Sequence, residues 1–303
     1  MFKIMARVAF IAALSLTAAA CGRDSAPGVA AAGDKPDQAI LASAKYAKQG
    51  DIAALVEHVM PPADFARIKA EWNDKKNAAD VSDEDRAKFA ATMAKLTAPN
   101  AADTLYAEIE PDLKQFDAQY KQQLPTMVAM GQGYLTSMVQ QSQQLSAAEK
   151  EQANNAIKAL AEWVQKTNFT DPALVKQSLA IFADTARELD LKTLDEARAL
   201  NFDQSAPKLK IAFNGFKKVL ALYGFSMDET LDSVKTDVIS NDGNAAKVKV
   251  GYTLLGTALA TETEMIRIDG RWYGKDTIEK LKQRAADSTM PVDAPAVAPK
   301  TND

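Results

Sequence analysis

The hydrophobic period of this chain changes near Val234, and this change restricts the folds that the chain can adopt. Before Val234, apolar residues recur at spacings of three and four, as on one face of an α-helix. After it, they alternate with polar residues, as on a half-buried β-strand; this alternation is clearest for Val248, Val250, Tyr252 and Leu254. We therefore predict an α+β fold that is predominantly helical, with a small C-terminal antiparallel sheet of three to four strands and a closing helix.

The helical part contains residues that start and end individual helices. Gly50 is predicted to end the first helix and Asp51 to cap the second, while Pro61 and Pro62 suit the start of a third. Further helix starts are predicted at Ser82, Ser146, Asp171 and Thr193, and after Pro207. So many amphipathic helices require a packed helical assembly.

A long helix is predicted over residues 113–145, opened by Pro111. Pro125 lies inside it, and we expect a kink or a break there, because proline removes a backbone donor and clashes with the preceding turn. Gly131 and Gly133 lie in the same stretch with no strand before them. They indicate a bend or close helix packing there, and not a phosphate-binding loop.

Two turn sequences divide the C-terminal part into strands. Both Asn241-Asp242-Gly243-Asn244 and Asp269-Gly270 are typical of tight hairpin turns. The strands are expected over residues 234–240, 248–254, 261–268 and 271–273, with a short helix over 276–284 closing the fold. Such a small sheet needs a helix on one face to be stable.

The first twenty-one residues have the three parts of a secretory signal. Lys3 and Arg7 give a positive start, and residues 8–16 form an apolar run that is too short to span a bilayer. The small residues 17–20 suit a cleavage site, and Cys21, the single cysteine of the chain, follows directly. A single cysteine excludes any internal disulfide.

This placement of Cys21 resembles the lipobox of bacterial lipoprotein precursors. The resemblance implies that the Cys21 thiol receives a diacylglyceryl group, that the signal is cut before it, and that the new N-terminus is acylated. Ala18 stands where this family usually has leucine. Gly22, in place of aspartate, resembles the sorting pattern for the outer membrane of Gram-negative bacteria, facing the periplasm. The alternative is a plain signal peptide with an incidental cysteine, which would leave an exposed, oxidisable thiol.

Composition divides the chain into five expected segments. They are a signal peptide over 1–20, a flexible tether over 21–36, a helical region over 37–225, an antiparallel sheet region packed on helices over 226–286, and a disordered tail over 287–303. The tether and the tail are rich in Ala, Gly, Pro and small polar residues, which cannot bury a core.

Two short sequences resemble periplasmic lipoproteins with an NTF2-like domain. One is Lys48-Gln49-Gly50-Asp51 between the opening helices, and the other is Ile268-Asp269-Gly270-Arg271-Trp272-Tyr273. The resemblance implies that the opening helices pack across a curved sheet. A concave sheet could then bind a small molecule against Tyr252, Trp272 and Tyr273. The long helical block over residues 82–206 departs from that compact family.

The sequence offers few residues for catalysis or metal binding. It has one histidine and one cysteine, so a metal site of converging His and Cys is not expected, and no cofactor motif is present. His58, near the end of the second helix, is interpreted as a capping or surface residue. The acids at 83–85, 108, 110, 188 and 190 are interpreted as solvated helix faces, and Phe213, Phe216, Tyr223 and Phe225 as core.

Net charge limits the partners. The formal charge of the whole chain is −4. The predicted signal contains two basic residues, Lys3 and Arg7, and no acidic ones, so its removal lowers the charge to −6. A phosphate-backbone binder normally carries a basic stripe, so no nucleic acid partner is expected.

Together these features predict a non-enzymatic lipoprotein of the cell envelope, anchored to a membrane at Cys21, without metal or cofactor, and binding another envelope protein or serving a structural role. The alternatives are a small-molecule binder with an NTF2-like domain and, less favoured, an enzyme that uses two facing carboxylates.

Overall fold

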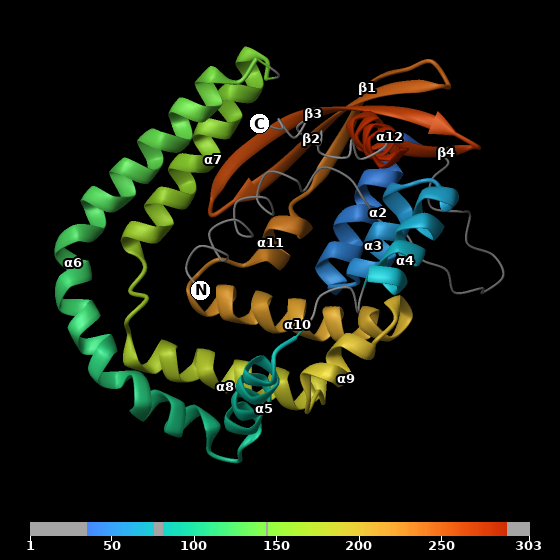
Figure 1. The fold of residues 1–303 in the computed structure, drawn as a ribbon. Coiled ribbons are helices and arrows are strands. Elements are labelled where there is room, and N and C mark those ends of the chain that lie inside the picture. Colours follow the sequence, from blue (N-terminus) through green and yellow to red (C-terminus); the bar gives the residue numbers. More distant parts are fainter. Residues whose placement is uncertain (1–34, 76–80, 144, 290–303) are drawn as a thin grey trace, which may run out of the picture.

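The computed structural model of the protein describes residues 35–75, 81–143 and 145–289. The predicted signal, Cys21 and residues 290–303 of the predicted tail lie outside these residues. The described chain confirms the α+β class, with eleven helices and one four-stranded antiparallel sheet (Figure 1). The helices are α2 (Pro36–Gln49), α3 (Ile52–Val59), α4 (Pro62–Lys75), α5 (Asp83–Thr97), α6 (Ala101–Gln141), α7 (Ala147–Lys166), α8 (Pro172–Leu189), α9 (Leu194–Ala199), α10 (Phe202–Leu222), α11 (Met227–Asp232) and α12 (Lys275–Thr289).

The sheet is an antiparallel meander in the order β1-β2-β3-β4. Its strands are β1 (Lys235–Asn241), β2 (Ala245–Leu254), β3 (Thr257–Ile268) and β4 (Arg271–Gly274). Both predicted turns join neighbouring strands as expected. A third turn, Leu255-Gly256, was not predicted; both residues have positive φ, and the turn lets β3 begin earlier than the expected residue 261. The closing helix α12 follows β4 directly.

One face of the sheet packs on the first helix. Val248, which is fully buried, and Trp272 lie in a core cluster with Ala39 of α2. The α7 helix covers the far end of β3, where the Gln152 side chain accepts a hydrogen bond of 3.0 Å from the backbone N–H of Ala260. The α2 helix and the sheet therefore share one core on this face, and α7 adds a contact at the edge of β3.

The opposite face of the sheet is divided between a second cluster and solvent. Tyr273 packs there with Ile278 of α12 and with Met60, which follows α3. Further along the same face, Lys247 pairs with Glu262 at 2.5 Å on the solvent-exposed surface. This half-covered arrangement is typical of an antiparallel sheet.

Most helices begin where local capping signals predicted. Ser146 and Thr193 form complete capping boxes with Glu149 and Glu196. The Asp171 carboxylate accepts from two backbone N–H groups at the start of α8, and Ser82 caps α5. These caps depend on residues within one helical turn, so sequence spacing is sufficient to find them.

The expected start of α10 after Pro207 is wrong. The helix begins at Phe202, where Asn201 and Gln204 form a capping box, and Pro207 lies inside it. The short helix α11 was also missed, although Ser226 caps it by accepting from the Glu229 backbone. In both places the sequence contains a capping signature, at Asn201 and at Ser226.

The expected boundaries of the long helix are also wrong. The α6 helix begins at Ala101 and runs without a break through Pro111 and Pro125 to Gln141 (Figure 1). In Figure 1 it is a continuous helix that curves along its length. Both prolines are exposed, so water can hydrate the carbonyls that they leave without an amide donor, and a break is not required.

The helices form an arch around one side of the sheet. In Figure 1, α6 and α7 make an antiparallel hairpin that leads from α8 toward β3, with α10 lying along α8. The Thr170 hydroxyl donates a hydrogen bond to the Asp117 carboxylate, which joins the loop between α7 and α8 to α6. The crossing of α8 and α10 is close: Gly215 is buried beside Thr185, and Ala183 and Ala186 of α8 are nearly inaccessible.

One lysine of α10 is buried. Lys217 of α10 donates a hydrogen bond to the backbone oxygen of Lys48 at the end of α2, and its Nζ lies 2.6 Å from the Asp228 carboxylate of α11. It joins α10 and α11, which are neighbours in the sequence, to the distant end of α2. A buried lysine is tolerated because an acid and a carbonyl oxygen compensate its charge.

Candidate functional site

The predicted lipidation site, Cys21, lies outside the described residues. It stays a prediction from sequence. The other predicted sites lie within the described chain.

The three aromatic residues proposed for a small-molecule pocket do not lie together. Trp272 is 3% exposed and packs with α2 on one face of the sheet, whereas Tyr273 is 2% exposed and packs with α12 on the other. Successive strand residues point to opposite faces, so this separation was readable from the sequence. Tyr252 is half-buried, and burial raises the pKa of its hydroxyl. A single pocket lined by all three side chains is therefore wrong.

His58 is a core residue, and its interpretation as a surface residue is wrong. Only 4% of it is exposed, and its Nε2–H donates to the backbone oxygen of Ala39 at 3.3 Å. Its Nδ1 has no hydrogen-bond partner among the described residues. Burial, with a smaller contribution from Arg271, lowers the pKa of the imidazole to about 3. His58 thus joins α3 to α2 as a neutral group.

The acidic residues on helices lie at the surface. Asp83, Glu84, Glu108 and Glu110 each pair with a lysine or arginine, at distances of 2.6 to 3.1 Å. The Ser82 hydroxyl lowers the pKa of Asp85. A general acid needs an apolar surrounding that excludes water, and these carboxyls at the surface lack one.

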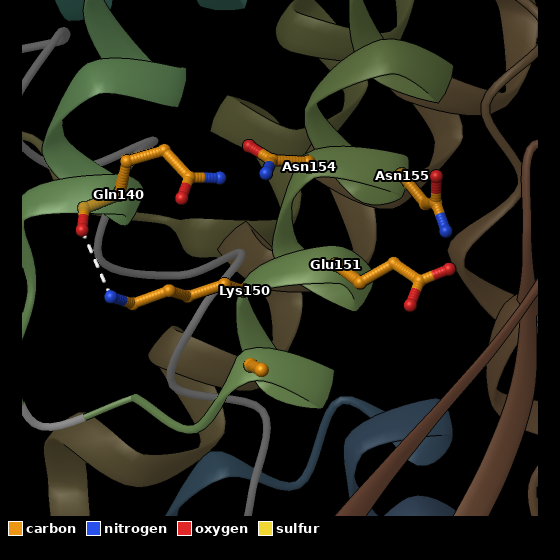
Figure 2. Close-up of a pocket in the computed structure, with 6 residues that line it drawn as sticks. Gln140, Lys150, Glu151, Asn154 and Asn155 are labelled. Atoms are coloured by element: carbon orange, nitrogen blue, oxygen red, sulfur yellow. Dashed lines mark hydrogen bonds between the residues drawn. The ribbon is translucent and has the colours of Figure 1, made fainter.

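A polar hollow lies between the end of α6 and the start of α7 (Figure 2). Its volume is about 550 Å³, and its lining includes Gln140, Lys150, Glu151, Asn154 and Asn155. Lys150 donates to the backbone oxygen of Gln140 at 2.9 Å, and the Gln140 and Asn154 amides face each other across the gap. The Asn154 Oδ1 atom is buried and has no donor in the described chain. The hollow can accept a polar group, but it offers no nucleophile.

A second groove of about 530 Å³ lies where α2, α3, α4 and α10 meet. Phe65 and Phe202 contribute apolar rings 5.5 Å apart, and Lys69 pairs with Asp203 at 2.6 Å at its rim. Its carboxylates at Asp51 and Asp203 are engaged in a helix cap and an ion pair. The groove therefore has the character of a helix junction.

An exposed apolar stripe runs along α6. We define the α6 stripe as Phe116, Tyr120, Leu124, Met127, Met130, Tyr134 and Met138. These residues recur at spacings of three and four, so they share one side of the helix. Phe116, Met127, Met130, Tyr134 and Met138 are exposed, and Tyr120 and Leu124 are half-buried. Apolar side chains at this spacing normally face a core, but here five of the seven are exposed.

The two glycines of α6 are as open as the stripe. A Cβ added at Gly131 or Gly133 would meet no other atom within 4 Å. The expectation of close helix packing at these glycines is therefore wrong for the described chain. Phe216, expected in the core, is also exposed, although Tyr223 and Phe225 pack against Phe169 and Trp163. Periodicity identifies an apolar face, but not whether another element covers it.

Comparisons of this chain with protein-family models, curated proteins and solved structures find no match. Within residues 35–75, 81–143 and 145–289, histidine, cysteine and acidic side chains nowhere form a group of three suited to a metal ion. None of the helices in this part of the chain combines the length and hydrophobicity that crossing a bilayer requires.

Proposed function

We propose that this protein is a lipid-anchored interaction module of the bacterial cell envelope, without enzymatic activity, held at a membrane through Cys21 and binding its partner through the α6 stripe. The observation that carries the proposal is the stripe itself. A contiguous exposed apolar surface on a soluble body marks a site of interaction, because single exposed apolar residues are common but an aligned set is not.

The signal sequence and Cys21 support the anchored state. Two or more acyl chains give stable membrane binding, whereas a single chain gives only marginal binding. Residues 22–35 separate Cys21 from α2, and fourteen residues reach at most about 50 Å when fully extended. An anchor of this length keeps the stripe near the membrane surface while leaving it free to meet a partner.

The anchor is tested by labelling with a tagged fatty acid in a Gram-negative host. The wild-type chain should carry the label and fractionate with membranes, and Cys21→Ala should lose both. Ser25→Ala, which leaves the signal and the cysteine unchanged, is the matched control and should behave as wild type. Label that persists in Cys21→Ala would end the proposal of lipidation at this residue.

The interaction role is tested separately, with Met130→Glu and Tyr134→Glu combined in the anchored full-length chain. Both side chains are exposed, so the variant should fold, with an unchanged circular dichroism spectrum. After chemical cross-linking in the envelope, the wild type should be recovered with its partner proteins, including any differently tagged copy of the chain that it binds. The double variant should be recovered without them. The control is Ala129→Glu, which is exposed on α6 but lies off the stripe. Identical cross-linking of all three chains would exclude the stripe as the binding surface.

A further inference from the structure

We infer that the partner of the α6 stripe is a second copy of this chain, packed antiparallel on the first about a two-fold axis at Met127. The inference rests on the proposed function, because it names the partner of the same surface. A two-fold interface must be complementary to itself: a residue before the axis meets the residue equally far after it.

The stripe has this symmetry about Met127. Apolar residues lie three, seven and eleven positions away on both sides. In an antiparallel pair centred on Met127, Leu124 meets Met130, Tyr120 meets Tyr134, and Phe116 meets Met138, with the two Met127 side chains at the centre. Spacings of three and four keep these residues on the side of the helix that faces the partner.

The charges of the helix are compatible with this pairing. Residues 122–148 contain no Asp, Glu, Lys or Arg. Nearer the start of α6, Asp117 would lie opposite Ser137 of the second copy, and Lys121 opposite Gly133, so no like charges oppose each other. Like charges are the usual obstacle when identical surfaces meet, and this stretch removes them.

Complete burial of the exposed stripe would reach the lower end of the area that specific dimers bury. Met130 and Tyr134 are 71% and 66% exposed, Met127 is 56% exposed, and Phe116 and Met138 are each 49% exposed. Taking about 200 Å² for a large side chain, the five expose about 600 Å² per copy, or about 1,200 Å² for two. Specific interfaces bury about 1,200–2,000 Å² in total, and the half-buried Tyr120 and Leu124 add to this area. The open surface at Gly131 allows the partner helix to approach closely.

A lipid surface fits the same stripe less well. Helices that lie in a membrane interface carry Lys and Arg on their polar face. The α6 helix instead has five acids, at positions 103, 108, 110, 112 and 117, against Lys114 and Lys121. Its net negative charge opposes contact with anionic headgroups, whereas a second copy presents no acid to the stripe.

Site-directed cross-linking of the full-length chain in membranes tests the dimer. Met127→Cys is treated with a short bis-maleimide, and Ala129→Cys, which points about 200° away around the helix, is the matched control. The unsubstituted chain reports any reaction of Cys21 itself. A covalent dimer formed by Met127→Cys, and by neither control, is the expected result.

The register is tested by co-expressing Tyr120→Cys and Tyr134→Cys as two differently tagged chains. The antiparallel pair predicts that the mixed dimer forms much more readily than either self-linked dimer. A parallel pair predicts the reverse, and that result would overturn the geometry.

Met127→Glu places two carboxylates at the centre of the pair and should weaken dimerisation by on the order of 100-fold or more, measured by detergent-phase light scattering. A monomeric wild type would overturn the inference. The inference would also be overturned if lipid vesicles, without a second copy, protected Met127→Cys from reaction with maleimide. The two proposals can fail separately. If the wild type forms no dimer, but the variant with both Met130→Glu and Tyr134→Glu loses a cross-link to a different protein, the interaction role stands and the partner is that protein.

Discussion

The crossing of α8 and α10 gives a sharp test of the packing described above. Gly215 lies inside α10, where alanine is normally better by about 1 kcal/mol, because glycine loses more backbone entropy on folding. Here a Cβ at Gly215 would lie 2.9 Å from Cγ2 and 3.2 Å from Cβ of Thr185, and closer still to Oγ1. Rotating the threonine exchanges Oγ1 and Cγ2 but leaves its Cβ in place.

We therefore expect Gly215→Ala to destabilise the full-length protein. Overpacking a buried contact costs about 1–3 kcal/mol, and the gain in helix propensity offsets about 1 kcal/mol of it. Because the added Cβ would lie within 3.0 Å of two Thr185 atoms, we expect the upper part of this range, about 2–3 kcal/mol. The expected net loss is then about 1–2 kcal/mol, which lowers Tm by about 2–4 °C for each kcal/mol in a chain of this size.

The matched control is Gly133→Ala on α6. No atom lies within 4 Å of its added Cβ, so the change should stabilise the protein by up to about 1 kcal/mol. Thr185→Ala removes the two atoms nearest to the added Cβ. The double variant should therefore regain most of the stability that Gly215→Ala loses, and a double-mutant cycle measures this as a coupling energy between the two positions. Thermal and urea unfolding measure the stability of the wild type and of all four variants. A Gly215→Ala protein that is as stable as the wild type would refute the close crossing.

Two further predictions concern the core. The pKa of His58 is lowered from 6.5 to about 3. As pH falls below 6.5, the unfolded chain therefore binds a proton that the folded chain does not. The free energy of unfolding should therefore fall by about 2 kcal/mol between pH 6.5 and pH 5, and should continue to fall toward pH 3. In urea titrations, His58→Phe should flatten the dependence of this free energy on pH over the same range. An unchanged slope in His58→Phe would assign the pH dependence to other groups. Met265 is 3% exposed in the core of the sheet. Met265→Ala should lower the free energy of unfolding of the protein by about 2–5 kcal/mol, and Met265→Leu by less than about 1.5 kcal/mol. Equal losses in the two variants would argue against tight packing around this side chain.

Several features could be predicted because they depend on neighbouring residues. The Ser146 and Thr193 capping boxes and the turn at Asp269-Gly270 involve groups within three or four positions of one another. The change of period near Val234 placed the sheet after the helices for the same reason. The missed capping box at Asn201 and the opposite directions of Trp272 and Tyr273 belong to this class, since both were readable from local spacing.

Other features depended on contacts across the chain. The position of His58 beside Ala39, the burial of Lys217 against the end of α2, and the close approach of Gly215 to Thr185 each join residues from separate helices. Their sequence neighbourhoods resemble those of exposed helix residues. Only the packing of the helices distinguishes them.

The α6 stripe shows where the division lies. The sequence by itself determined that Met127, Met130, Tyr134 and Met138 share one side of a helix, because the helical period is fixed by backbone geometry. From local patterns it also predicts a secretory signal that ends at Cys21, and this stays a prediction. Tertiary structure decided that these four side chains stay exposed, because burial depends on which elements meet in space.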